Sequence, residues 1–514
     1  MKKVNITRRQ FLRFLGYGAI SIAGSQILSA CSAFIEEGAD ALILGEPDVE
    51  IRLIATPGEQ QIFPGLPTKV WRYQGEVLKG PPDSIVSLPD SYLGPVFQVN
   101  KGVHLRVHFE NELPEETIVH WHGLHVPEEA DGHPRLAIGS GESYQYDFRV
   151  MDRAGTYWYH PHPHGRTGPQ VYQGLAGLFL IQDDEEAALS LPENDRDLLI
   201  VIQDRYFDDE NQMIYDPTVM GMFGDRILVN GLPDYKVAVD RGSHRLRLMN
   251  GSNARIYKLA WEDGTPLQVI GTEGGLLEEP LVRDYVTLAP AQRIDLWVDF
   301  GIWEPGEEIR MINLSALVVG GEETFPIFSA IIQNNEREKA SLPAHFPSHE
   351  ELYAVQAVNA DAPRTFELQM GMGMRWMING RRFEMTDVAR DEKVRLGDTE
   401  IWEFFNPNSA RMQMPGMVQA HPMHVHGLQF KILERQSESV DENSYNSLKD
   451  GFVDEGWHDT VLVMPGERVR ILMRFTDFSG LYLYHCHNLE HEDMGMMRNY
   501  QVKGGEIPIQ SIVD

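Results

Sequence analysis

The sequence predicts an all-β protein made of three β-sandwich domains in tandem. Short runs rich in β-branched and aromatic residues recur between Gly, Pro, Asn and Asp along most of the chain, and helical periodicity is rare. Two polar stretches, at 182–195 and 334–349, divide these runs into three blocks of similar size. A chain of 514 residues has room for two to four domains. The blocks share no close sequence repeat, so their equivalence is inferred from size and pattern.

Residues 1–31 have the features of a targeting segment. A twin arginine at 8–9 precedes a short apolar stretch at 14–28, which resembles a twin-arginine (Tat) export signal. The stretch ends in Leu-Ser-Ala-Cys31, which resembles a lipobox; an Ala-x-Ala-like cleavage site and an uncleaved anchor are the alternatives. We therefore expect Tat export to the periplasm or cell surface as a lipoprotein anchored through Cys31, with residues 32–48 as a tether.

The predicted domains are residues 49–188, 189–340 and 341–514, called here the first, second and third blocks. Each is expected to form a sandwich from its own strands. The runs expected as strands are 50–55, 69–74, 96–99, 103–109, 117–121, 144–149 and 155–159 in the first block; 197–203, 226–229, 244–250, 258–261, 268–271, 286–288, 294–300 and 309–313 in the second; and 365–370, 400–406, 430–434, 458–463, 467–475 and 482–486 in the third.

Charge and cysteine content narrow the function. The formal net charge of −31 argues against nucleic acid as a partner, because nucleic-acid binding needs a basic face. The two cysteines, Cys31 and Cys486, are too few for a disulfide framework. If Cys31 is lipidated, Cys486 is the only thiol of the folded body. Its place between two histidines favours a ligand or a nucleophile over the alternative, a small buried apolar residue.

The stretch 485–497, His-Cys-His-Asn-Leu-Glu-His-Glu-Asp-Met-Gly-Met-Met, concentrates metal-binding side chains. The apolar and aromatic residues before it predict a strand, in which neighbouring side chains face opposite ways. One face would then carry two histidines and the other Cys486, so one segment can serve two metal centres. Cys486, His491 and Met496 make most of a blue-copper site, which has two histidines, a cysteine and a weak axial methionine.

The histidines of the chain are clustered in the first and third blocks. Four His-x-His pairs supply eight imidazoles, more than one metal ion uses, which predicts a multinuclear centre shared between these blocks. They are His120 and His122, His160 and His162, His424 and His426, and His485 and His487. His421 is left over and supplies the missing histidine of the blue-copper set. Most of the other histidines are expected to be surface or structural, with His164 and His458 as possible neighbours of the metal sites.

The combination HWHG at 120–123, HPH at 160–162, HPMHVHG at 421–427 and HCHNLEHEDMGMM at 485–497 resembles the multicopper oxidases of the three-cupredoxin type: laccases, bilirubin oxidases and bacterial cuprous oxidases. The resemblance covers nearly all of the mature chain. It implies three tandem cupredoxin-like Greek-key β-sandwich domains and four copper ions. Carried over by position, it assigns type 1 copper to His421, Cys486, His491 and axial Met496, type 2 copper to His120 and His424, and the type 3 pair to His122, His160, His162, His426, His485 and His487.

The resemblance also implies a reaction. A reductant gives up electrons one at a time at type 1 copper, and dioxygen is reduced to water by four electrons at the three-copper cluster. Asp131 and Glu492 match positions that supply protons in bacterial cuprous oxidases, and ordinary surface acids are the alternative. Those enzymes also have an aspartate four residues before the first type 1 histidine, where this chain has Met417. An acid-assisted substrate contact at that place is therefore in doubt.

The reductant is predicted from two methionine runs, 370–377 and 412–417, the second just before His421. Thioethers select Cu(I), so we expect Cu(I) or another metal ion as substrate and a role in copper homeostasis. Methionines that only fill core gaps are the alternative, the long Met- and His-rich insert of dedicated cuprous oxidases is absent, and phenols and aromatic amines stay open as substrates. Other classes are a laccase-like oxidase of organic reductants, a non-catalytic cupredoxin-fold cell-envelope protein, and a copper nitrite reductase or electron carrier. We expect a monomer.

Overall fold

The structure is a computed structural model that describes residues 45–336, 340–349, 351–371, 373–407, 419–437 and 440–504. The predicted signal, Cys31, most of the tether and the methionine run 412–417 lie outside the described residues. Strands account for 47% of the structure and helices are few, which confirms the all-β prediction. No helix within the described ranges is both long and apolar enough to cross a membrane.

The first block forms two sheets around one core. Apolar residues alternate with polar ones in β1, so Ile51, Leu53 and Ala55 point into the core. The sheet orders are β2-β1-β5-β7 and β3-β4-β9-β8-β6. The strands are β1 (Val49–Gln60), β2 (Thr68–Lys79), β3 (Ile85–Val86), β4 (Val96–Asn100), β5 (His104–Asn111), β6 (Val119–His122), β7 (Ser143–Arg149), β8 (Gly155–Pro161) and β9 (Gly177–Gln182).

The second block has the same two-sheet construction. Residues of both sheets, among them Leu246, Leu259 and Met311, share one buried cluster. The orders are β12-β11-β10-β14-β19-β16-β17 and β13-β21-β20-β15-β18. The strands are β10 (Asp197–Arg205), β11 (Arg226–Val229), β12 (Leu232–Pro233), β13 (Lys236–Arg241), β14 (Ser243–Asn250), β15 (Tyr257–Trp261), β16 (Leu267–Thr272), β17 (Gly275–Arg283), β18 (Val286–Leu288), β19 (Arg293–Asp299), β20 (Glu308–Asn313) and β21 (Phe325–Glu336).

The third block repeats the pattern, and its core includes Cys486 and Met496. The orders are β23-β22-β25-β29-β27 and β24-β31-β30-β26-β28. The strands are β22 (Arg364–Gly371), β23 (Arg375–Ile378), β24 (Lys393–Arg395), β25 (Thr399–Phe405), β26 (His421–Val425), β27 (Phe430–Gln436), β28 (Thr460–Val463), β29 (Arg468–Arg474), β30 (Gly480–Cys486) and β31 (Met497–Lys503). Each described sheet draws its strands from one block, although the domain bounds themselves stay a prediction.

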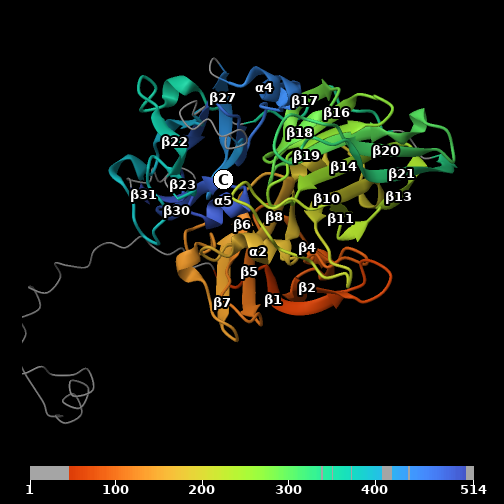
Figure 1. The fold of residues 1–514 in the computed structure, drawn as a ribbon, viewed down its shortest axis with the longest axis horizontal. Coiled ribbons are helices and arrows are strands. Elements are labelled where there is room, and N and C mark those ends of the chain that lie inside the picture. The colour runs from red at the N-terminus through yellow and green to blue at the C-terminus, as the bar shows by residue number, and fades with distance from the viewer. Residues whose placement is uncertain are drawn as a thin grey trace, which may run out of the picture. The chain divides into compact units, whose positions relative to one another are not determined.

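In the described ranges, four short α-helices connect the strands, and two of them meet near the histidine clusters. They are α2 (Thr167–Tyr172), α3 (Asp184–Ala187), α4 (Glu442–Leu448) and α5 (Leu489–Asp493). The sequence analysis did not predict α2 or α5. Figure 1 shows α5 of the third block beside α2, β6 and β8 of the first block, and α2 and α5 are in contact. The predicted sites of both blocks therefore lie where the blocks meet.

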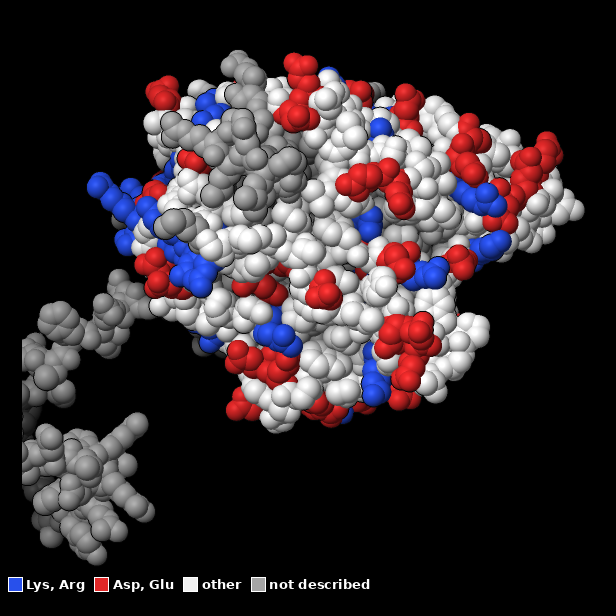
Figure 2. Space-filling view, viewed as in Figure 1, with Lys and Arg blue, Asp and Glu red and all other residues white. Residues whose placement is uncertain are grey.

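Apolar clusters join the blocks. Tyr92 and Trp158 of the first block pack with Val201 and Leu228 of the second, and a separate cluster joins the second block to the third. Burial of apolar surface at such contacts favours one fixed arrangement of the sandwiches. On the side drawn in Figure 2, acidic side chains are scattered widely over the surface, as the net charge of −31 requires.

Candidate metal centres

Cys486, His421 and His491 bring their donor atoms together in a buried triangle. Cys486 Sγ lies 3.4 Å from Nδ1 of His421 and 3.6 Å from Nδ1 of His491, and the two nitrogens are 3.2 Å apart. A point inside the triangle lies about 2.0 Å from each of the three donor atoms. For comparison, a protein-bound zinc ion usually lies about 2.0 Å from nitrogen and about 2.3 Å from thiolate sulfur. The triangle therefore fits one small metal ion with little rearrangement.

Met496 and Trp376 complete the surroundings of this triangle. Met496 is fully buried; its N–H donates to the His491 carbonyl at 2.9 Å, and its own carbonyl accepts from the Cys486 N–H at 3.0 Å. The Trp376 ring packs 4.1 Å from the ring of His491 and 5.0 Å from that of His421, measured between centroids. An apolar shell of this kind excludes water and tunes a His₂Cys site with a weak thioether ligand.

Helix α5 brings His491 back to Cys486. The Asn488 side chain accepts a hydrogen bond from the His491 N–H at 3.3 Å, so Asn488 caps the first turn of the helix. Gly495 ends the segment with φ of +111°, a conformation that glycine adopts without strain. This short turn-helix-turn explains why a histidine five residues after the cysteine and a methionine five residues further share one site.

The eight histidines of the four His-x-His pairs form a second, larger cluster, and all of them are buried. Nε2 of His120 lies 3.4 Å from Nε2 of His424, which joins the first block to the third. Nε2 of His485 lies 3.3 Å from Nε2 of His162 and 3.0 Å from Nε2 of His426. The rings of the remaining three, His122, His160 and His487, have centroids 5.0–5.6 Å apart.

Hydrogen bonds on the outer side of these rings select the nitrogen that faces the cluster. Nδ1 of His120 donates to the Asp131 carbonyl at 2.6 Å, and Nδ1 of His424 donates to the Asp459 carbonyl at 2.7 Å. In each ring, Nε2 is then the nitrogen that keeps a lone pair for a metal ion. His122 is reversed: Nε2 donates to Asp459 Oδ1 at 3.0 Å, and its buried Nδ1 has no hydrogen-bond partner among the described residues.

The electrostatics of both sites suit metal ligands. Burial lowers the pKa of His160 and of His421 to about 3 and that of His162 to about 4, so these imidazoles are neutral and keep their lone pairs. Burial raises the pKa of the Cys486 thiol, so it keeps its proton in the metal-free protein, and the charge of a bound cation would displace that proton. Buried nitrogens without a partner in the described part of the chain, such as His160 Nε2 and His487 Nε2, also call for an ion.

The strand β30 connects the two sites. His485 and Cys486 are consecutive, with the Cys486 sulfur in the triangle and the His485 ring in the histidine cluster. His487 follows directly and packs against the rings of His122 and His160. Alternation of side chains along a strand produces this division, as the sequence analysis expected.

The predicted acids Asp131 and Glu492 are both buried at the histidine cluster. Asp131 Oδ2 accepts from His426 Nδ1 at 2.9 Å, and burial raises the pKa of this carboxyl well above its usual value. Glu492 Oε1 accepts from Thr167 Oγ1 at 2.7 Å, and its Oε2 lies 3.1 Å from His485 Nδ1. Burial by itself would raise the pKa of Glu492, but the neighbouring His162 and His485 outweigh this effect and lower the pKa to about 2. Neither acid is on the surface, so the surface-acid alternative is wrong.

Two site residues were missed by the sequence analysis. Asp459 contacts His122 and His424 directly, and Arg293 of the second block forms an ion pair with Asp459. Only the position of Asp459 just before an apolar strand hinted at it, and nothing in the sequence relates residue 293 to the cluster. The two histidines that were expected as possible neighbours of the metal sites lie elsewhere. His458 is buried against Glu273, and His164 is exposed beside Phe383; among the described residues neither bonds to a predicted ligand.

Comparisons with known proteins agree with this geometry. Two models of multicopper oxidase domains match residues 69–186 and 357–506. The chain is 32% identical to multicopper oxidase mco of Staphylococcus aureus, over 84% of this chain and 87% of that protein. It is 30% identical to a laccase of Bacillus subtilis, over 84% and 90%. The crystal structure of McoA multicopper oxidase from Aquifex aeolicus is similar, with a TM-score of 0.77, 34% identity and coverage of 89% and 97%.

A more distant relative is a cell division protein, FtsP of Photorhabdus laumondii, with 28% identity over 96% of this chain and 98% of that protein. The solved relatives confirm the cupredoxin-like fold that the sequence motifs implied. The buried triangle of Cys486, His421 and His491, the eight-histidine cluster and the extent of these matches lead to one assignment. The chain belongs to the multicopper oxidase family and is a copper-dependent oxidoreductase that uses dioxygen as electron acceptor.

Proposed function

We propose that the protein couples the one-electron oxidation of a small reductant, with Cu(I) as the best candidate, to the four-electron reduction of dioxygen to two waters. Four reductant electrons and four protons balance this reaction. The observation that carries the proposal is the pair of buried donor sets joined through Cys486. We assign one copper ion to the triangle and three to the histidine cluster, with the type 1, type 2 and type 3 ligands named in the sequence analysis.

Bound copper would supply the redox chemistry that moves single electrons from the reductant to dioxygen. The chain's own residues bind and orient these ions: the outer hydrogen bonds of His120, His424 and His426 hold each ring with one nitrogen inward. Complete burial of the histidines keeps bulk water from the cluster. The covalent link from the Cys486 sulfur through the backbone to His485 and His487 gives the two sites the shortest connection that a chain can offer.

Glu492 is the best candidate for delivering protons. Its low pKa keeps it a carboxylate near neutral pH, so it would accept a proton and pass it on; it lies against two predicted ligands, His162 and His485, and against Thr167 of α2, whose hydroxyl can relay the proton. Asp131 contacts His426 through its carboxylate and His120 through its carbonyl, so it orients two ligands from behind and can also store a proton. We therefore assign proton transfer to Glu492 and ligand positioning with a proton reserve to Asp131.

Methionines near the triangle support Cu(I) as reductant. Trp376 of β23 packs against both triangle histidines, and Met374, two residues earlier in the chain, is 46% exposed, so a thioether close in sequence to this contact is open to solvent. Met377 lies on the same short strand and is half-buried. Soft thioethers hold Cu(I) well, and an acidic protein surface attracts cations. The second run, 412–417, lies outside the described residues and enters the proposal from the sequence.

The test measures copper per chain, oxygen uptake and product with Cu(I) and a phenol. We expect about four copper ions, water as product, and oxidation of both reductants. Met412, Met414 and Met417 changed together to Leu should raise the KM for Cu(I) about tenfold, or about 1.4 kcal/mol of binding, and leave phenol turnover within about twofold. Met311→Leu, in the separate core of the second block, is the matched control and should change neither substrate.

Each other outcome selects a different function. An unchanged KM for Cu(I) in the triple variant would favour a laccase-like oxidase of phenols and aromatic amines. Equal losses on both substrates would mean that the methionines only pack around the site. A copper content near zero would favour a non-catalytic cell-envelope protein, as the similarity to FtsP allows, whereas one or two ions per chain would favour an electron carrier.

We also propose Tat export and lipid anchoring at Cys31, from the sequence alone. A protein exported in its folded state can receive its metal ions before crossing the membrane. This suits a chain whose two centres are buried. We propose a monomer in solution or at the membrane surface.

A further inference from the structure

The second block, which supplies no predicted copper ligand, reaches the surroundings of the histidine cluster with the side chain of Arg293. Arg293 begins β19, and its guanidinium donates two parallel hydrogen bonds to the Asp459 carboxylate, Nη1 to Oδ1 at 2.9 Å and Nη2 to Oδ2 at 2.5 Å. Both side chains are completely buried. A bidentate pair of this kind fixes orientation as well as distance, because the guanidinium fork is planar and rigid.

Asp459 passes this orientation to two predicted ligands. Its Oδ1 accepts from His122 Nε2 at 3.0 Å, and its backbone carbonyl accepts from His424 Nδ1 at 2.7 Å. His122 belongs to the predicted type 3 pair and His424 to the predicted type 2 site. A displacement of Asp459 would therefore rotate one ligand of each kind, and His122 depends on this contact to present Nδ1 inward.

Arg293 is held from all three blocks. Its Nε donates to the Thr156 carbonyl of the first block at 2.8 Å, and its Nη1 also donates to the Ala291 carbonyl of the second at 2.9 Å. Gly123, the last residue of the HWHG motif, lies against the pair. A Cβ at Gly123 would approach Asp459 Oδ2 to 2.4 Å and Arg293 Nη2 to 3.0 Å, so the motif leaves space for this ion pair.

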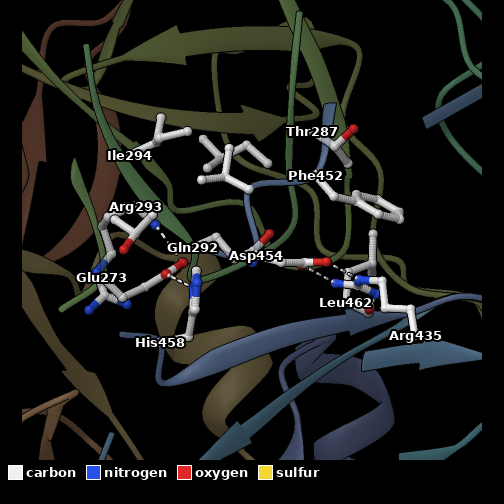
Figure 3. Close-up of a pocket in the computed structure, with 13 residues that line it drawn as sticks. Glu273, Thr287, Gln292, Arg293, Ile294, Arg435, Phe452, Asp454, His458 and Leu462 are labelled. Carbon is white, nitrogen blue, oxygen red and sulfur yellow. Dashed lines mark hydrogen bonds and ion pairs between the residues drawn. The ribbon is translucent and has the colours of Figure 1, made fainter. Parts of the chain in front are cut away.

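A second buried pair supports Arg293 from the side away from the cluster. The Arg293 backbone N–H donates to Glu273 Oε1 at 3.3 Å, and Glu273 Oε2 bonds to His458 Nδ1 at 2.6 Å. Figure 3 shows these three residues at one end of a cavity of about 20 Å³ between the second and third blocks, with Asp454 and Arg435 at the other end. The cavity has room for about one water molecule.

We propose that Arg293 is a positioning residue of the three-copper centre: through Asp459, the second block sets the ring orientations of His122 and His424. The inference rests on the proposed copper assignment. It gives the middle sandwich a role in the reaction besides spacing the outer two. Groups behind metal ligands often contribute about 10- to 100-fold to metal affinity or activity, which is the size of effect expected here.

The test is Arg293→Lys in the full-length, copper-loaded protein. Lysine keeps the charge but cannot form two parallel hydrogen bonds to Asp459. We expect the type 2 paramagnetic resonance signal to weaken or change shape and kcat to fall about tenfold or more. The blue absorption and the KM for the reductant should stay at the parental values, because the triangle of Cys486 does not touch Asp459.

Arg245→Lys is the matched control. Arg245 is equally buried in the second block and pairs with Asp295 at 2.5 Å and with Glu186, neither of which is a predicted ligand. This variant should lose thermal stability as Arg293→Lys does and keep the type 2 signal. If both lysine variants change that signal equally, or if Arg293→Lys keeps the parental signal and kcat, the proposal is overturned.

Two further measurements keep the result decisive. If Arg293→Lys does not fold, Asp459→Asn replaces it; this change preserves size and should alter the type 2 signal in the same way, whereas a parental signal would refute the proposal. The copper-loaded parent is measured first. A parent without any type 2 signal would contradict the copper assignment itself, which separates failure of the proposed function from failure of this inference.

Discussion

Glu492→Gln is the substitution that tests proton delivery most directly. The carboxylate accepts from Thr167 at 2.7 Å and lies 3.1 Å from Nδ1 of His485. A glutamine amide has the size of the carboxylate but carries no charge, so its contacts with Thr167 and His485 are no longer charge-assisted; a hydrogen bond to a charged group is worth about 1.5–3 kcal/mol. Glutamine also cannot release a proton. A positioned acid contributes about 10²- to 10⁴-fold to rate, so we expect kcat to fall at least about 100-fold.

The assay separates electron uptake from oxygen chemistry. Bleaching of the blue band by reductant under nitrogen should keep its parental rate in Glu492→Gln, while steady-state oxygen uptake falls. The reductant KM should not rise, since Glu492 contacts the histidine cluster and not the triangle. Asp493→Asn is the control: that carboxylate accepts from the N–H groups of Thr167 and Gly168 and should leave kcat near the parental value. A fully copper-loaded Glu492→Gln protein with parental kcat would refute the reasoning.

Three further predictions follow from the same structure and sequence. Cys486→Ser should abolish the blue colour and the oxidase activity but leave the type 2 signal, and a variant that stays blue would contradict the type 1 assignment. Burial lowers the pKa of His160 and His421 to about 3, below the value of about 6.5 in an unfolded chain. The copper-free protein should therefore lose stability as pH falls from about 6.5 toward 3, because the unfolded chain binds more protons than the folded one. A melting temperature that increases as the pH is lowered from 7 to 5 would disprove this. Lysines in place of the arginines at 8–9 should retain the protein in the cytoplasm, and Cys31→Ala should release a soluble mature form; membrane-bound Cys31→Ala would end the lipidation proposal.

Local pattern in the sequence was sufficient for much of the fold and most of the candidate site. Strands follow from alternation of apolar and polar residues, as in β1, and from β-branched and aromatic runs. The paired histidines on β6 and those around β30 followed from the two-residue period of a strand. The helices α2 and α5 were not predicted, because their few residues are too short for helical periodicity to show.

The sequence by itself determined which residues can serve as ligands, since only certain side chains bind copper and their spacing along a strand is local. Only the tertiary structure decided which nitrogen of each histidine faces inward, because that depends on acceptors from distant segments, such as the Asp131 carbonyl for His120 and Asp459 for His122. It also decided that Arg293 of the second block reaches the cluster. An ion pair between residues far apart in the chain forms where packed domains exclude water, and no local pattern records such a contact.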